Sequence, residues 1–319
     1  MSRVLVTGGA GTIGAAVVRR LLRDGDWDVR VSDQRPAPEW MREGAEIHQG
    51  DLRDLVQARE ATAGCTHVIH LAAIVGGIAN FHKLPLTLSE VNSALYGGVV
   101  RSAVLECVER FVYVSSSMVF ERATQFPTTE QHVWDCPWPR SAYGFSKLAG
   151  EVWVRAAHDE EGLPFTICRP FNAYGPGEMP EDEPGIAHMV PDVIKKCLAL
   201  PDGAPLPIFG TGEQTRTITH VDDIADGVVT AMGHPAALNE DFNVSAGDEM
   251  TVAEIARVIW EESGKPPGAF ALEHLPTFEV DVQRRWPSVD KARTVLGWEA
   301  QIGVREGVAQ TIEWLRSRV

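Results

Sequence analysis

Hydrophobic and polar positions in the first half of the chain follow two alternating patterns. Residues 4–7 form a short apolar run typical of a strand, a glycine-rich loop follows, and residues 13–22 carry apolar positions at helical spacing. Helical stretches separate most of the further strand candidates, which are residues 28–32, 45–48, 67–71, 110–114 and 165–169. Strands that alternate with helices predict an α/β fold with a doubly wound parallel sheet.

The pattern changes after Pro170. Proline and glycine cluster through residues 174–180, and the later segments are shorter and less regular. We therefore predict one domain over residues 1–170 and a smaller, loop-rich region over residues 171–319.

Composition and charge narrow the class of protein. The chain has 319 residues, of which 44% are hydrophobic and 23% charged, as in an ordinary globular protein. Its net charge of −15 disfavours a broad contact with nucleic acid or with an anionic membrane surface, because both need dense lysine and arginine. We expect neither partner.

The cysteines and the lengths of the apolar runs favour a protein of the cytoplasm. None of the five cysteines stands in a short metal-ligand spacing, so we expect no metal site and a reducing compartment. We also expect no leader segment and no membrane span, because no apolar run approaches roughly 18 residues.

The glycine loop has the character of a phosphate-binding turn. Gly8, Gly11 and Gly14 stand between a strand and a helix, where small residues let the backbone approach a pyrophosphate. Asp33 ends the next strand, where a carboxylate can accept hydrogen bonds from an adenosine ribose. This favours NAD, although Arg35 leaves NADP open. A glycine turn that only packs a helix against a strand is the alternative interpretation.

A tyrosine and a lysine lie four residues apart in a predicted helix. Tyr143 and Lys147 therefore project from one face, and a nearby ammonium is expected to lower the pKa of the phenol from about 10. The strand at residues 110–114 delivers Ser115-Ser116-Ser117 at its carboxyl end, where doubly wound sheets bind ligands. An exposed tyrosine–lysine pair on a solvated helix is the alternative.

These motifs together resemble the extended short-chain dehydrogenase/reductase family, in particular its NAD-dependent nucleotide-sugar epimerase and dehydratase branch. The resemblance covers nearly the whole chain. It rests on the glycine loop, Gly50-Asp51-Leu52, His70-Leu71-Ala72-Ala73, Asn92, the serine, tyrosine and lysine set, residues 169–176, 210–216 and 220–225, and Arg284-Arg285 ahead of Leu296-Gly297-Trp298.

The resemblance implies a Rossmann-like NAD-binding domain that regains segments around residues 213–245, and a smaller C-terminal substrate-binding region. It implies that Tyr143 is the base, that Lys147 holds the nicotinamide ribose, and that Ser116 bonds the reacting sugar oxygen. The implied NAD-binding residues are Gly8, Gly11, Thr12, Ile13, Gly14, Asp33, Asp51, Leu52, Leu71, Ala72, Ala73, Asn92, Tyr143, Lys147 and Pro170. The implied substrate-binding residues are Val75, Ser116, Ser117, Asn172, His188, Gln214, Arg216 and Arg285.

Two departures from the family select among its reactions. Ser117 and Met118 occupy the places where the related dehydratases carry an Asp-Glu pair, and the 3,5-epimerases carry a cysteine at the second place. Because Met118 has no titratable proton, we expect epimerisation at C4 of a nucleotide-linked sugar through a transient 4-keto intermediate. His188 keeps open a 3,5-epimerase or a 4-keto reductase. A non-catalytic dinucleotide-binding sensor is the alternative of another class.

The helix expected over residues 90–106 has two apolar stripes. One contains Val91, Leu95 and Val99, and the other contains Tyr96, Val100 and Val104. One stripe is expected to face the sheet, and the other a partner subunit or another helix. Since the family often dimerises through the corresponding helices, we predict a homodimer.

Overall fold

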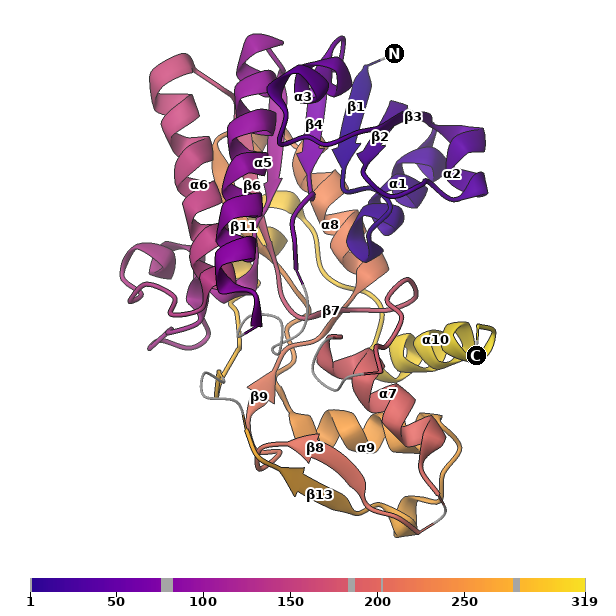
Figure 1. Ribbon diagram of the computed structural model, residues 1–319. Helices are drawn as coiled ribbons and strands as arrows, with labels where there is room; N and C mark the ends of the chain where they lie inside the picture. The colour runs from indigo at the N-terminus through magenta and orange to yellow at the C-terminus, as the bar shows by residue number, and fades with distance from the viewer. Residues whose placement is uncertain (1, 76–82, 183–186, 202, 278–281, 319) are drawn as a thin grey trace.

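A seven-stranded parallel sheet forms the centre of the upper part of the molecule in the computed structural model, which describes residues 2–75, 83–182, 187–201, 203–277 and 282–318 (Figure 1). The strand order is β11-β6-β5-β4-β1-β2-β3, and each neighbouring pair is parallel. Its strands are β1 (Arg3–Thr7), β2 (Asp28–Asp33), β3 (Glu46–Gln49), β4 (His67–His70), β5 (Arg110–Val114), β6 (Phe165–Pro170) and β11 (Glu240–Val244). The six strands predicted from the sequence are confirmed with ends within one residue, and the doubly wound α/β fold is confirmed.

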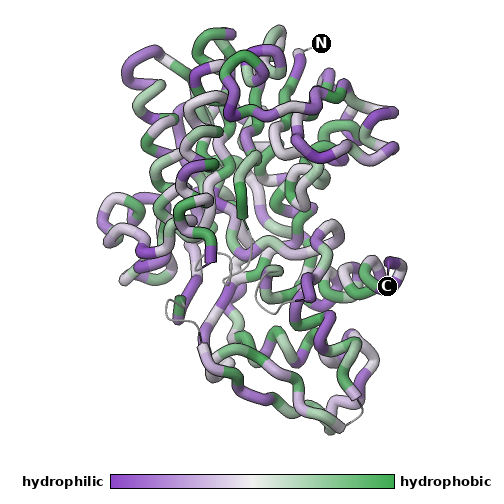
Figure 2. Tube along the Cα trace, viewed as in Figure 1, coloured by the Kyte–Doolittle hydropathy of each residue, from purple (hydrophilic) through white to green (hydrophobic). Residues whose placement is uncertain are grey.

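Helices cover both faces of this sheet because its strands are hydrophobic on both sides. In β1, Val4 and Val6 face one layer and Leu5 faces the other. The first layer contains α1 (Thr12–Asp24) and α8 (Val221–Gly233), and the second contains α3 (Leu55–Thr62), α5 (Pro85–Leu105) and α6 (Ala142–Glu161). Figure 2 shows that the central strands are mainly hydrophobic, whereas hydrophilic residues gather in peripheral loops. The short helix α2 (Glu39–Gly44) follows β2.

Both stripes of α5 are covered within the chain. Leu95 and Val99 are buried, and so are Tyr96 and Val100, in one cluster with α3, α6 and the sheet. The alternative that the second stripe packs under another helix is therefore correct, and this stripe is not a surface for a partner.

A second core lies below the sheet in Figure 1. It contains α7 (Met189–Ala199), α9 (Val252–Glu262) and α10 (Val304–Arg316). Short strand pairs complete this part: β8 (Leu206–Phe209) with β13 (Leu272–Leu275), β7 (Ala173–Tyr174) with β10 (Thr219–His220), and β9 (Thr215–Arg216) with β12 (Met250–Thr251). Short 3-10 segments are Ser117–Phe120, Glu130–Trp134, Pro235–Ala237 and Pro267–Ala269, and a π-helical turn spans Ala292–Leu296.

The chain passes to the second core after β6 and returns to the sheet with α8 and β11. The division at residue 170 with returning segments around 213–245 stays a prediction. No helix within the described ranges is both long and apolar enough to cross a membrane.

Candidate active site

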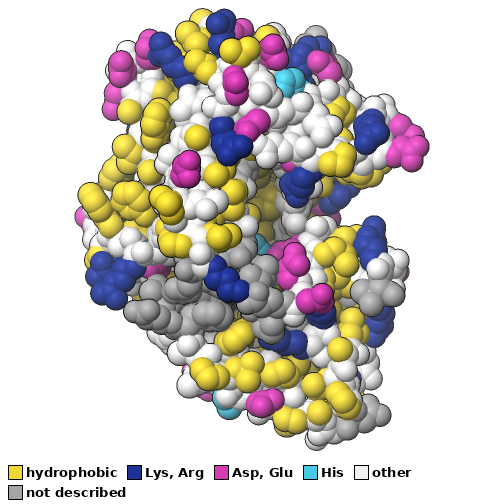
Figure 3. All heavy atoms as spheres, viewed as in Figure 1, with side chains coloured by type: hydrophobic (Ala, Val, Ile, Leu, Met, Phe, Trp, Pro, Cys, Tyr) yellow, Lys and Arg dark blue, Asp and Glu magenta, His cyan; other side chains and the backbone are white. Residues whose placement is uncertain are grey.

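A cavity of about 1000 Å³ lies between the carboxyl ends of the sheet strands and the second core. Figure 3 shows the surface hollowed at this level, with acidic and basic side chains at the rim. Most residues predicted for the site line the cavity: Gly8, Gly11, Thr12, Ile13, Gly14, Asp33, Leu52, Leu71, Ala72, Ala73, Val75, Ser116, Ser117, Tyr143, Lys147, Pro170, Asn172, His188, Gln214, Arg216 and Arg285. Residues 76–78, which directly follow Val75, lie outside the described part of the chain.

The glycine loop packs too closely for side chains. Gly8 has a φ of +70°, and a Cβ there would stand 2.8 Å from the backbone of Ala72. A Cβ on Gly14 would stand 2.2 Å from the carbonyl oxygen of Gly8. Thr7 Oγ1 fixes the facing segment by accepting hydrogen bonds from the backbone N–H groups of Leu71 and Ala72, each at 3.2 Å. The loop therefore brings bare backbone to the cavity wall.

The N-terminus of α1 has no side-chain cap and suits the binding of an anion. Its N-cap is Gly11, which has no side chain to accept from the first turn, and the first turn contains no acidic residue. Such a helix end carries a partial positive charge and unpaired N–H groups. The loop and helix therefore suit a pyrophosphate.

Asp33 stands beside the glycine loop as a fixed carboxylate. Its Oδ2 accepts from the N–H of Ala10 at 3.0 Å, and its Oδ1 accepts from the N–H and Nε of Arg35 at 3.0 and 3.1 Å. Burial raises the pKa of Asp33, but the bonds to Arg35 and its charge outweigh burial and lower the pKa overall. An ionised carboxylate at this edge suits ribose hydroxyls.

Two predicted NAD-binding residues occupy other places. Asp51 pairs with Arg53 at 2.9 Å, and this bond holds the pKa of Asp51 at about 2. Among the described residues that line the cavity, Arg53 is present and Asp51 is not. Asn92 is fully buried, and its amide bonds the backbone N–H and carbonyl of Ile74 at 2.8 and 3.2 Å. Both residues position neighbouring parts of the wall, and their direct contact with a cofactor stays a prediction.

Ser116, Tyr143 and Lys147 all line this cavity. Ser116 follows β5, and its Oγ accepts from the N–H of Met118 at 3.1 Å. The helix α6 begins after Ser141, whose hydroxyl accepts from the N–H of Gly144, so Tyr143 and Lys147 lie in its first turns. Lys147 Nζ donates to the carbonyl of Val114 at 2.9 Å, which ties this helix to the end of β5.

The expected effect of Lys147 on Tyr143 is wrong for this structure. Burial raises the pKa of Tyr143 to about 12, and the groups that lower it are the Ser116 hydroxyl and the charge of Arg285. Burial also lowers the pKa of Lys147, to about 8. The sequence shows the helical spacing of the two residues but not how deeply both are buried.

Four of the predicted substrate-binding residues, Asn172, Gln214, Arg216 and Arg285, form a polar wall of the cavity. Arg285 Nη1 donates to Asn172 Oδ1 at 2.9 Å, and Asn172 Nδ2 donates to the carbonyl of Thr217 at 2.8 Å. Arg216 Nη1 donates to the carbonyl of Val282 at 2.6 Å. Gln214 is buried and donates to the carbonyl of Phe209 at 2.8 Å. The structure thus brings these four side chains together.

His188 forms a pair that the sequence did not indicate. Glu178 Oε1 accepts from both the backbone N–H and the ring Nδ1 of His188, each at 2.8 Å. Burial lowers the pKa of His188 and Arg285 does too, but the Glu178 carboxylate outweighs them and the pKa is raised. Both side chains line the cavity. The cavity is therefore lined by a second pair of titratable side chains besides Tyr143 and Lys147.

Comparison with known proteins now identifies the family. Residues 4–245 match the model of the NAD dependent epimerase/dehydratase family. The chain belongs to the NAD-dependent epimerase/dehydratase family. It is 32% identical to a UDP-glucose 4-epimerase of Mycolicibacterium smegmatis, with 99% of each chain covered.

Solved structures of similar proteins agree with this family. A crystal structure of UDP-glucose 4-epimerase from Thermotoga maritima with UDP-glucose is 27% identical, with a TM-score of 0.86 and 99% of each chain covered. A UDP-glucose 4-epimerase from Thermus thermophilus in complex with NAD is 27% identical, with a TM-score of 0.84, and the match covers 99% of this chain and 100% of that one. NAD is the cofactor of this epimerase/dehydratase, and the glycine cradle, the open end of α1 and the Asp33 carboxylate fit it.

Several charged residues of this epimerase/dehydratase site were missed by sequence reasoning. Arg53, Glu178, Glu181, Asp192 and Lys196 also line the cavity. Glu178 lies in the proline- and glycine-rich segment 174–180. The sequence analysis used that segment only to place the start of the second region. The contact between Glu178 and His188, which are ten residues apart, depends on the tertiary fold. No local spacing in the sequence could therefore predict it. In the described part of the chain, no group of three His, Cys, Asp or Glu side chains is arranged to hold a metal ion.

Proposed function

We propose that this family member epimerises a UDP-linked hexose at C4 through a transient 4-keto sugar. The observation that carries the proposal is that a methionine, Met118, lies beside the tyrosine and the serine. Met118 lines the cavity next to Ser116 and Tyr143, and its sulfur contacts Arg285 Nη2 at 2.9 Å. A thioether neither gives nor takes a proton. The serine, tyrosine and lysine set therefore supports a reaction in which one hydroxyl group is oxidised and then restored.

The chain's own residues would move one proton and hold the reacting groups. Tyr143 takes the proton from O4 of the sugar, and it returns the proton when the alcohol re-forms. Ser116, whose hydroxyl lies within hydrogen-bond reach of the tyrosine, donates its one hydrogen bond to the same sugar oxygen when substrate is bound. Lys147 holds the nicotinamide ribose. When bound, NAD supplies the hydride acceptor and a positively charged ring near the phenol.

The polar wall would anchor the nucleotide diphosphate while the sugar turns. Arg285 and Arg216 suit phosphate because a guanidinium donates parallel hydrogen bonds in one plane. Asn172 and Gln214 add neutral donors. Inversion at C4 needs the 4-keto sugar to present its other face, and a grip on the diphosphate leaves that movement free. Thr12 and Ile13 at the start of α1 and Pro170 at the end of β6 belong to the proposed cofactor contacts.

A second candidate function rests on the pair of His188 and Glu178. An imidazole in the cavity whose pKa is raised can supply a proton at neutral pH. That chemistry favours epimerisation at C3 and C5, or reduction of a 4-keto sugar. Either reaction would need a second acid or base, and His188 is the residue that could fill this role.

An isotope experiment separates these functions. The NAD-loaded protein is incubated with UDP-glucose in deuterated water, and the product is analysed by NMR. The 4-epimerase proposal expects UDP-galactose with no deuterium on carbon, because the hydride removed from C4 returns to C4. Deuterium at C3 or C5 would establish the second candidate. Bound NAD that stays oxidised with UDP-glucose and with other nucleotide hexoses would favour a non-catalytic sensor.

We also propose that the enzyme works in the cytoplasm as a homodimer. The cysteines of the described residues are all free, as expected in a reducing compartment. Exposed apolar side chains gather on the outer sides of α5 and α6, where Figure 3 shows a hydrophobic band at the left edge. They are Leu86 and Leu105 on α5 and Phe145, Val152 and Trp153 on α6. A patch of this kind is typical of a protein–protein interface.

A further inference from the structure

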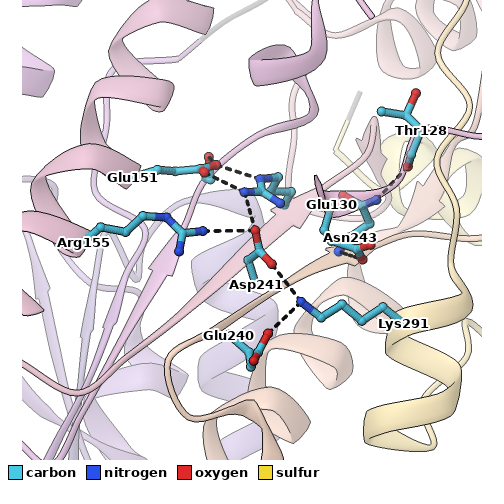
Figure 4. Close-up of polar contacts among 10 residues, drawn as sticks. Thr128, Glu130, Glu151, Arg155, Glu240, Asp241, Asn243 and Lys291 are labelled. Atoms are coloured by element: carbon cyan, nitrogen blue, oxygen red, sulfur yellow. Dashed lines mark hydrogen bonds and ion pairs between the residues drawn. The ribbon is translucent and has the colours of Figure 1, made fainter. Parts of the chain in front are cut away.

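A largely buried network of charges joins α6 to the strands β6 and β11. Arg169, at the end of β6, is fully buried and donates from Nε and Nη2 to the two carboxylate oxygens of Glu151, at 2.8 and 2.7 Å. The Nη2 group also donates to Asp241 of β11 at 2.8 Å. Figure 4 shows Glu151 and Asp241 arranged around this guanidinium.

The network is balanced in charge and reaches the chain's late segments. Asp241 also accepts from Arg155 at 3.1 Å and from Lys291 at 2.9 Å, and Lys291 pairs with Glu240 at 2.8 Å (Figure 4). Three carboxylates therefore face three cations. Buried ion pairs cost solvation energy and add little stability compared with apolar packing. A network of this size next to a reaction centre therefore calls for a role beyond stability.

Glu151 connects the network to the catalytic residues at two points. It lies one helical turn after Lys147 on α6, so both side chains leave the same face of the helix. Its Oε1 also accepts from the Ser115 hydroxyl at 2.6 Å, and Ser115 directly precedes Ser116. Its side chain is 2% exposed, so no solvent screens its charge.

We propose that Glu151, held by Arg169, is a positioning residue that keeps Lys147 charged and fixes the end of β5 beside it. This inference rests on the role proposed for Lys147. A fully buried lysine tends to lose its proton, and burial has lowered its pKa to about 8. The charge of Glu151 acts in the opposite direction and raises that pKa. Without it, the ammonium would lose its proton within the working pH range.

Among the described residues, the other groups around Lys147 carry no compensating charge. From β4, His70 is kept neutral because burial and then the lysine itself lower its pKa to about 3. From β5, Tyr113 lies with its ring 5.3 Å from Nζ, and burial raises its pKa well above 10. From α5, Tyr96 bonds Tyr113 and also has a raised pKa because of burial. Tyr143 on α6 is likewise neutral at pH 7.

The test compares Glu151→Gln with Glu161→Gln in the NAD-loaded protein. Glu161 ends the same helix, is 41% exposed, and pairs with Arg101, so it controls for loss of a carboxylate from α6. The pKa of Lys147 is read by NMR of isotope-labelled lysine, with Lys147→Arg identifying the signal. The proposal expects a midpoint about one pH unit lower in Glu151→Gln and no change in Glu161→Gln. The alkaline limb of kcat moves to lower pH by the same amount.

An equal midpoint in the two variants would overturn the proposal, even if Glu151→Gln is less stable. If Glu151→Gln does not fold, Glu151→Asp keeps the carboxylate for Arg169 but shortens the side chain that carries it. A smaller shift of the same midpoint to lower pH is then expected, and an unchanged midpoint would count against the proposal. Because the NMR signal needs no sugar substrate, an inactive protein with a shifted lysine would count against the proposed function and not against the network.

Discussion

Arg285 and Asn172 form a direct hydrogen bond at 2.9 Å although 113 residues separate them in the chain. The main chain of Asn172 has a φ of +39°, a value that non-glycine residues seldom adopt. Strain of this kind persists where surrounding contacts require it, and it clusters at functional sites. Here the side-chain amide of Asn172 joins the segment after β6 to Arg285 of the C-terminal part. The two residues proposed to bind the diphosphate therefore lie side by side.

Replacing Arg285 by alanine is expected to weaken substrate binding and to leave NAD binding unchanged. A hydrogen bond to a charged group is worth about 1.5–3 kcal/mol, so KM for the nucleotide sugar should rise roughly 10- to 100-fold. Arg284→Ala is the matched control, because Arg284 is the adjacent arginine and its exposed side chain pairs with Glu249. Steady-state kinetics with both variants checks this. A similar KM in the two variants would remove Arg285 from the site.

Replacing Tyr143 by phenylalanine is expected to lower kcat by about 10²- to 10⁴-fold, the usual contribution of a positioned acid or base. NAD content should stay near that of the unchanged protein. Tyr174→Phe is the control, because that hydroxyl is buried without a hydrogen-bond partner in the described part of the chain. Turnover by Tyr143→Phe at the rate of the control would exclude the tyrosine as base.

The same tyrosine gives a prediction for the alkaline titration of the ligand-free protein. Burial raises the pKa of each of the four tyrosines, and Tyr143, at about 12, is the lowest of them. The first tyrosinate absorbance to appear on raising the pH should therefore vanish in Tyr143→Phe. Added NAD should move this first step to lower pH, because its positive ring favours the phenolate. An unchanged first step in the variant would contradict the assignment.

The pair of His188 and Glu178 should make stability depend on pH. The lowered pKa of Glu178 stabilises the fold above the unfolded carboxyl pKa of about 4.3, and this contribution is lost as pH falls through the folded value. The raised pKa of His188 stabilises the fold below about pH 6.5, and this contribution is lost as pH rises through the folded value. Both contributions are present together only near pH 5.5.

Urea unfolding at several pH values checks this prediction. The difference in the free energy of unfolding between the unchanged protein and Glu178→Gln should be largest near pH 5.5 and should shrink toward alkaline pH. Glu181→Gln removes an exposed carboxylate from the same stretch and should show no such maximum. A difference that stays constant with pH would mean that the two side chains do not interact as a charged pair.

The strands that alternate with amphipathic helices could be predicted from the sequence, but β11 could not. Its sequence begins with Glu240 and Asp241, which look like surface residues. Asp241 lies inside because Arg169 and Lys291 reach it from distant parts of the chain, and no local pattern carries that information. The network of Glu151 was missed for the same reason.

The site's members were largely predictable, whereas its electrostatics were not. Tyr143 and Lys147 line the cavity as their spacing indicated. The pKa of the tyrosine moves in the direction opposite to the prediction because burial, a property of the whole fold, outweighs the charges nearby. Met118 shows the opposite case, since its lack of a proton is a property of the residue alone and holds in any fold.

The homodimer proposal predicts that Trp153→Glu converts a dimer into a monomer. The side chain of Trp153 on α6 is 45% exposed, and that of the adjacent Val152 is 53% exposed. Burying a carboxylate in an apolar interface without a partner is costly, so association should be lost while the fold persists. Trp40→Glu, which changes an exposed tryptophan on α2, is the control. Light scattering measures the mass of each variant, and a monomer for the unchanged protein would refute the proposal.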